Sequence, residues 1–129
     1  MDTHGKIAAA LHIINGLFWL LMVLVGVFVF GSVAAIAGLD QTADGKAVMD
    51  IVVGAAKVVG GLFAVLAIAE IVSAVLYLQG SASARIWLIV FSALALLNIP
   101  IGTAIGGYSL WALLRDEAIP PQRGAAVAA

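Results

Sequence analysis

The chain has 129 residues, of which 64% are hydrophobic and 10% are charged, and its mean hydropathy is +1.20. Soluble domains carry roughly 25% charged residues, so most of the surface of this chain cannot face water. Several long apolar runs indicate a helical membrane protein whose main partner is the lipid bilayer.

Six Lys and Arg stand against seven Asp and Glu, so no basic excess is available to bind a nucleic acid. The chain has no Cys and two His, which excludes disulfides, thiol chemistry and Cys-based metal sites. We therefore expect no metal and no other cofactor. Residues 40–45, DQTADG, resemble the start of an EF-hand loop, but Ile51 stands where the bidentate Glu is required, so we interpret them as a polar turn.

Residues 7–30 form the first expected transmembrane helix. Their apolar run is longer than the roughly 7–15 residues of a secretory signal core, so we expect a retained span. An acidic loop follows. The charged side chains of residues 46–57 then fall on a single helical stripe, which predicts an amphipathic interfacial helix that enters the bilayer as a second span over residues 58–78.

Residues 86–114 contain no charged side chain but are interrupted by Pro100. One interpretation is a single tilted helix kinked at that proline, which gives three spans. The other is a hairpin with one helix over residues 83–98 and a second over residues 100–115, which gives four. Pro is a normal first residue of a helix, and the residue before it disfavours the α region.

The distribution of charge favours the hairpin. With four spans, Lys6, Arg85 and Arg115 share one side of the membrane, and the acidic loop lies opposite. Basic residues concentrate on the cytoplasmic side, so both termini are expected there. The predicted fold is therefore all-α, a polytopic four-helix transmembrane bundle that forms a single domain over residues 1–117. A flexible tail is expected over residues 118–129.

The last expected segment, PIGTAIGGYSLWALL at residues 100–114, resembles the final segment of a family of small bacterial multi-pass inner-membrane proteins, which reads approximately PIGTAxGxYxLWxLL. Residues 11–21 resemble the first span of those proteins, and residues 84–98 resemble their third. Gly107 departs from the pattern, because a bulky aliphatic commonly precedes the tyrosine. The family has no assigned activity, so the resemblance implies a fold and a bacterial inner membrane.

Glu70 is the main candidate for chemistry, because a carboxylate within a span is costly and normally faces the bundle interior or water. At 1.5 Å per residue, His12, Asn15 and Tyr108 lie at about the same depth as Glu70, roughly 10 Å from the cytoplasmic side. His12 and Asn15 also share a helix face. These four residues are the predicted intramembrane polar cluster. It serves either as a proton or cation site or as a hydrogen-bonded group that fixes helix register.

Small residues and aromatic residues complete the pattern. Glycines at small-xxx-small spacing predict faces where helices approach closely; they are Gly102, Gly106 and Gly107 in the last span and Gly60 and Gly61 in the second. Trp87 and Trp111 lie near Arg85 and Arg115, and these four residues fit interfacial anchors on the cytoplasmic side.

Two functions remain open at this point. The first is a non-enzymatic structural or accessory subunit, which packs its helices against its own copies or against a larger membrane complex. The second is an oligomeric small channel or a proton- or cation-coupled transporter that uses Glu70. An enzyme is not expected, because the sequence offers no nucleophile–base pair and no metal-ligand set.

Overall fold

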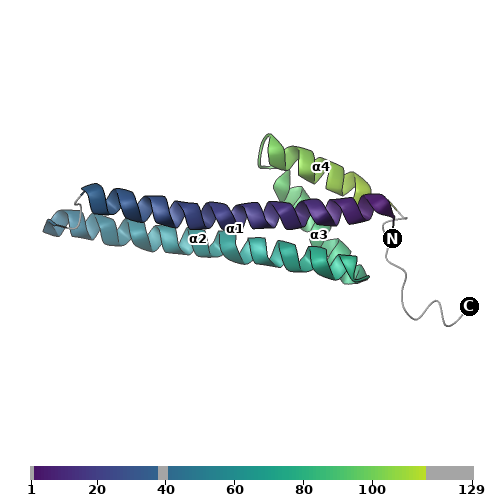
Figure 1. The fold of residues 1–129 in the computed structure, drawn as a ribbon, viewed down its shortest axis with the longest axis horizontal. Coiled ribbons are helices and arrows are strands. Elements are labelled where there is room, and N and C mark those ends of the chain that lie inside the picture. Colours follow the sequence, from purple (N-terminus) through teal and green to yellow (C-terminus); the bar gives the residue numbers. More distant parts are fainter. Residues whose placement is uncertain (1, 38–40, 116–129) are drawn as a thin grey trace, which may run out of the picture. The chain divides into compact units, whose positions relative to one another are not determined.

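A computed structural model describes residues 2–37 and 41–115 of the chain. It contains four helices: α1 (Thr3–Ala37), α2 (Ala43–Leu78), α3 (Ala82–Ala95) and α4 (Ile101–Leu114) (Figure 1). No strand occurs within the described residues. The all-α architecture with four helices is therefore confirmed, whereas the tail expected over residues 118–129 lies outside the described residues.

The two long helices extend beyond their expected limits. Helix α1 begins at Thr3 and runs past Phe30, and α2 joins the expected amphipathic stretch and the second span into one helix. Side chains cap both starts: the Asp2 carboxylate accepts a hydrogen bond from the Gly5 N–H at 2.9 Å, and the Thr42 hydroxyl accepts one from the Gly45 N–H at 2.9 Å.

Helices α1 and α2 are long and apolar enough to cross a membrane, judged by length and composition. Helices α3 and α4 have 14 residues each, so each is about 21 Å long at 1.5 Å per residue. That length is shorter than the roughly 30 Å hydrocarbon core of a bilayer. By length, α1 and α2 can cross a bilayer, whereas α3 and α4 are each shorter than its hydrocarbon core.

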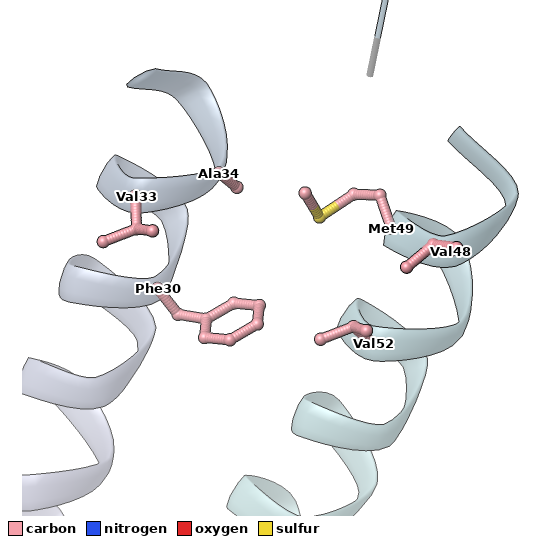
Figure 2. Close-up of a pocket in the computed structure, with 6 residues that line it drawn as sticks. All are labelled: Phe30, Val33, Ala34, Val48, Met49 and Val52. Carbon is pink, nitrogen blue, oxygen red and sulfur yellow. The ribbon is translucent and has the colours of Figure 1, made fainter. Parts of the chain in front are cut away.

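The chain divides into two compact units. The two-helix unit comprises residues 17–68, and the four-helix unit comprises the described residues of the rest of the chain. Within the two-helix unit, Trp19 stacks on Phe63 with ring centroids 5.4 Å apart. Near the α1–α2 connection, three side chains of α1 face three of α2 around a small apolar pocket (Figure 2); they are Phe30, Val33, Ala34, Val48, Met49 and Val52.

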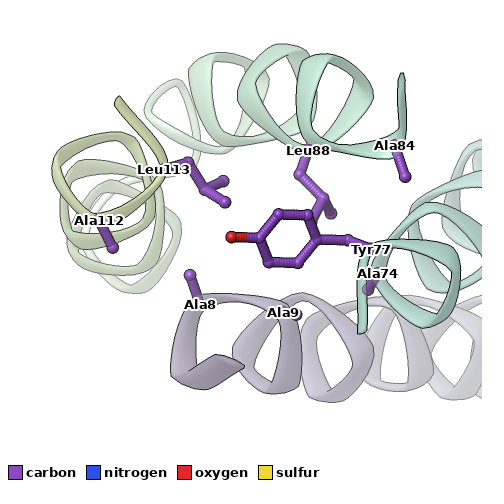
Figure 3. Packing of buried hydrophobic residues seen from close by; sticks show 8 residues of the cluster. All are labelled: Ala8, Ala9, Ala74, Tyr77, Ala84, Leu88, Ala112 and Leu113. Atoms are coloured by element: carbon purple, nitrogen blue, oxygen red, sulfur yellow. The ribbon is translucent and has the colours of Figure 1, made fainter. Parts of the chain in front are cut away.

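The buried core lies in the four-helix unit. The Tyr77 ring occupies its middle, with Leu88 and Leu113 beside it (Figure 3). Five alanines from all four helices complete the cluster: Ala8, Ala9, Ala74, Ala84 and Ala112. Alanine adds little bulk, so the helix backbones approach one another closely around a single large ring.

The chain reverses direction between α3 and α4, so the expected hairpin is present and the single kinked helix is wrong. Hydrogen bonds within the turn occupy backbone carbonyl groups at the end of α3. The Asn98 N–H donates to the Ala95 carbonyl at 3.0 Å, and the Thr103 hydroxyl donates to the Leu96 carbonyl at 2.9 Å. At the open end of the hairpin, the Arg85 guanidinium donates to the Leu113 carbonyl at 2.7 Å. An arginine suits this position because the last carbonyls of α4 carry partial negative charge.

The predicted packing glycines divide into two groups. A Cβ atom at Gly102 would lie 2.5 Å from the Ala95 carbonyl oxygen, and one at Gly106 would overlap the Ser92 carbonyl oxygen. These two glycines therefore hold α4 against α3. A Cβ at Gly60 would make an ordinary contact with Val23, 3.7 Å away, and Gly61 and Gly107 have more open surroundings.

We expect Gly106→Ala to destabilise the α3–α4 hairpin and Gly107→Ala to stabilise it. Both changes raise helix propensity by about 1 kcal/mol, but the methyl group at position 106 meets backbone of α3, whereas at position 107 the nearest atom is 3.9 Å away. Unfolding in mixed micelles, followed by helical circular dichroism, compares the pair. Equal stability of the two variants would contradict the close approach at Gly106.

Candidate functional site

A buried polar cluster lies within the four-helix unit. It consists of His12 and Asn15 on α1, Glu70 on α2 and Ser92 on α3. His12 and Ser92 have no exposed surface, Glu70 is 5% exposed and Asn15 is 8% exposed. Three helices thus contribute polar side chains to one buried site.

Each helix places its polar residue on the face that it buries. On α1, Ala8 and Ala9 belong to the core; His12 lies one turn beyond them, and Asn15 lies two turns beyond Ala8. On α2, Glu70 lies on the same stripe as Ala67, Ala74 and Tyr77, all of which are buried. On α3, Ser92 follows Ala84 and Leu88 at intervals of four residues. The helical period thus places each polar residue on the same face as the buried residues of its own helix.

Hydrogen bonds connect the cluster in a chain. Nδ1 of His12 lies 2.5 Å from Oε1 of Glu70, and Nε2 of His12 lies 2.8 Å from the Ser92 hydroxyl oxygen. The Asn15 amide donates to both Glu70 oxygens, at 3.0 and 3.2 Å. The Ser92 hydroxyl lies 2.7 Å from the Leu88 carbonyl oxygen, to which it can donate.

Hydrogen bonds within the cluster offset the free-energy cost of burying the Glu70 carboxyl group. A carboxylate buried without partners would cost several kcal/mol, whereas Glu70 has an imidazole at one oxygen and amide donors at both. Two buried side-chain oxygens of the described residues, Asp2 Oδ2 and Ser109 Oγ, have no hydrogen-bond partner, and neither belongs to the cluster. The Glu70 group is therefore a closed hydrogen-bond network, which ties α1, α2 and α3 together.

Tyr108, the fourth predicted member, lies elsewhere. Its hydroxyl forms a hydrogen bond with Nδ1 of His4 at 3.0 Å. The physical reason is that Glu70 and Ser92 already occupy both ring nitrogens of His12. Equal depth along the helices, which was the basis of the prediction, does not specify the direction in which a side chain points.

His4 and Tyr108 belong to a second group, at the helix ends. The His4 ring meets the Trp111 ring edge to face, with centroids 5.1 Å apart. The Arg115 guanidinium lies over Trp111, 4.9 Å from its centroid, and 3.9 Å from the Asp2 carboxylate. This end cluster joins the start of α1 to the end of α4.

The four predicted anchors lie around this end of the hairpin. Trp87 and Trp111 are both more than half exposed. Arg85 caps α4 through the Leu113 carbonyl, and Arg115 pairs with Trp111 and Asp2. Exposed tryptophans beside arginines fit an interfacial position, and the same arginines also hold the helix ends.

Sequence reasoning missed Ser92 and His4. Ser92 is a hydroxyl within a long uncharged stretch, and its i−4 spacing to Leu88 and Ala84 could have placed it on the buried face. His4 lies close to the start of the chain, where helices commonly fray, but Asp2 caps the helix there. Ser73 on α2 is also buried, but its hydroxyl donates to the Ala69 carbonyl of its own helix at 2.7 Å.

The described residues contain no group of three His, Cys, Asp or Glu side chains that could hold a metal ion. The chain matches no protein-family model, and no curated protein and no solved structure shows a significant similarity to it. The site must therefore be interpreted from its own geometry.

A double-mutant cycle tests the His12–Glu70 contact. We expect His12→Leu to lower the free energy of unfolding by about 1–3 kcal/mol, because it leaves the buried Glu70 carboxyl short of a partner. Adding Glu70→Leu removes that unpaired group, so the double variant should be more stable than the two single costs predict. The measurement is unfolding in mixed micelles; Tyr108→Phe, which touches the end cluster, is the control. Additive costs would contradict the pairing.

Proposed function

We propose that the chain is a non-enzymatic subunit of the bacterial inner membrane, which acts through helix packing with its own copies or with a larger membrane complex. The observation that carries this proposal is the surface of residues 17–36 and 41–68, most of whose side chains are apolar and exposed. Soluble monomers rarely expose large contiguous apolar patches. Lipid and neighbouring helices are the natural occupants of such a surface.

Two positions on this surface are suited to close helix contact. Around Gly54 and Gly61 on α2, added Cβ atoms would meet nothing within 4 Å. They are seven residues apart, so they lie on nearly the same helix face. Open glycines on an apolar face let a second helix approach its backbone. This supports a role in assembly for α2, whereas Gly102 and Gly106 serve the chain's own hairpin.

The charges support a membrane orientation. Lys6, Arg85 and Arg115 lie at the ends of helices in the four-helix unit, and Asp44 lies at the start of α2. The positive-inside rule then favours cytoplasmic N- and C-termini. The chain has no Cys, so single cysteines placed near these ends can be labelled from either side without background.

The alternative function, an oligomeric channel or a proton- or cation-coupled transporter, requires Glu70 to face a shared axis or a water-filled path. The Glu70 side chain instead lies buried among the helices of its own chain, where it is hydrogen-bonded to His12 and Asn15. This arrangement favours the packing role over an oligomeric pore lined by the acid.

The decisive measurement is the oligomeric state, with any co-purifying subunit, in native nanodiscs. We expect a mass above that of one 13.2 kDa chain, either from several copies or from a stoichiometric partner. Gly61→Leu should shift the distribution toward the single chain, because the added side chain separates helices that meet at this face. Gly107→Ala, where the nearest atom to the added methyl group is 3.9 Å away, is the control and should leave the assembly intact.

Two results would overturn the proposal. One is a single chain that has no partner in native nanodiscs. The other is a cation or proton flux in liposomes that Glu70→Gln abolishes and Gly61→Leu leaves unchanged, because that pattern belongs to a transporter.

A further inference from the structure

The Ser92 hydroxyl occupies a position with two possible acceptors. Its oxygen lies 2.7 Å from the Leu88 carbonyl oxygen and 2.8 Å from Nε2 of His12. A serine hydroxyl has one hydrogen and accepts at its lone pairs. It can therefore donate to Leu88 while it accepts from Nε2, or donate to Nε2 itself. The two arrangements differ by rotation of the O–H bond.

In the first arrangement, Nε2 carries a hydrogen and donates it to the Ser92 oxygen. One more proton lies between Nδ1 of His12 and Oε1 of Glu70, which are 2.5 Å apart. If that proton is on nitrogen, the pair is an imidazolium and a carboxylate; if it is on oxygen, the pair is an imidazole and a carboxylic acid. The net charge is zero in both cases, which suits an enclosed site.

In the second arrangement, Nε2 has lost its hydrogen and accepts one from Ser92. Nδ1 keeps its hydrogen and donates it to the Glu70 carboxylate, so the net charge is −1. The two amide contacts from Asn15 stabilise this charge. The Leu88 carbonyl retains its backbone partner within α3, because the helix continues past Ser92. In either arrangement both ring nitrogens of His12, both Glu70 oxygens and the Ser92 hydroxyl keep a hydrogen-bond partner.

We propose that His12, Glu70 and Ser92 form a binding site for one proton, which is taken up and released at Nε2 of His12 as the Ser92 hydroxyl rotates. On release, the Nε2–H bond breaks, its electron pair stays on nitrogen, and the proton passes to water. His12 and Ser92 have no exposed surface, so water reaches Nε2 only when the helices separate transiently. The change between the two hydrogen-bond arrangements itself moves no side-chain heavy atom. This goes beyond the proposed subunit role, since a packing subunit does not require an exchangeable proton.

Other titratable groups of the four-helix unit lie on the same elements. They are His4 and Lys6 on α1, Tyr77 on α2, Arg85 on α3 and Tyr108 on α4, with Asp2 and Arg115 flanking α1 and α4. His4 is bonded to Tyr108, and Arg85 is bonded to the Leu113 carbonyl. The side chains of His12 and Glu70 are hydrogen-bonded to each other, to Ser92 and to Asn15.

Nitrogen-15 NMR of His12 in nanodiscs tests the proposal, because it distinguishes a nitrogen that carries hydrogen from one that does not. The chain has two histidines, so His4→Gln leaves His12 as the sole signal. As the pH rises from about 5 to about 10, we expect Nε2 to change from the hydrogen-bearing to the bare type, while Nδ1 keeps its hydrogen bond to Glu70. Loss of hydrogen at Nδ1, or an unchanged Nε2 across the range, would overturn the proposal.

The variant Glu70→Gln provides a matched comparison. Its amide oxygen can accept from Nδ1 but cannot balance an imidazolium, so Nε2 should be bare at every pH in the range. If Nε2 still titrates as in the parent chain, Glu70 is not part of the proton site. Should this variant fail to fold, the titration of the His4→Gln chain decides the matter alone, with circular dichroism as the check that the helices persist.

Discussion

The contact between His12 and Glu70 is the interaction on which the four-helix unit depends. It joins α1 to α2, and through Nε2 of the same imidazole it reaches Ser92 on α3. Directional hydrogen bonds in an apolar surrounding define a helix register more sharply than aliphatic packing, since a shift along the helix would leave polar atoms unpaired. The alanine-rich contacts around Tyr77 require the same register.

The same contact has a chemical consequence. A histidine with both ring nitrogens bonded, one to an acid and the other to a serine that can either donate or accept, has two complete hydrogen-bond arrangements that differ by one proton. A structural network and a proton site are thus compatible descriptions of the same atoms. The exposed apolar surface of the described residues within 17–68 is a separate feature. It bears on whether lipid or other helices surround the protein, and not on the chemistry of the buried cluster.

Much of the architecture follows from local sequence patterns. Long apolar runs specify helices because every backbone polar group must be satisfied within the chain when water is excluded. Pro100 specifies a helix start, and charge at residues 85 and 115 favoured a hairpin over a kinked helix. The continuation of residues 46–57 into the second span is confirmed, whereas α2 starts earlier than expected, at Ala43, since composition marks the edge of an apolar run and not the end of a helix.

The sequence by itself determined that the chain is helical, that Glu70 is its most unusual group, and that His12 and Asn15 share a helix face, because these follow from composition and the 3.6-residue period. Only the tertiary structure decided that Ser92 completes the Glu70 group, that Tyr108 bonds to His4, and that Gly102 and Gly106 serve the α3–α4 contact. The reason is rotation: depth and spacing fix a position along a helix axis, whereas the direction of a side chain depends on which neighbours pack against that helix.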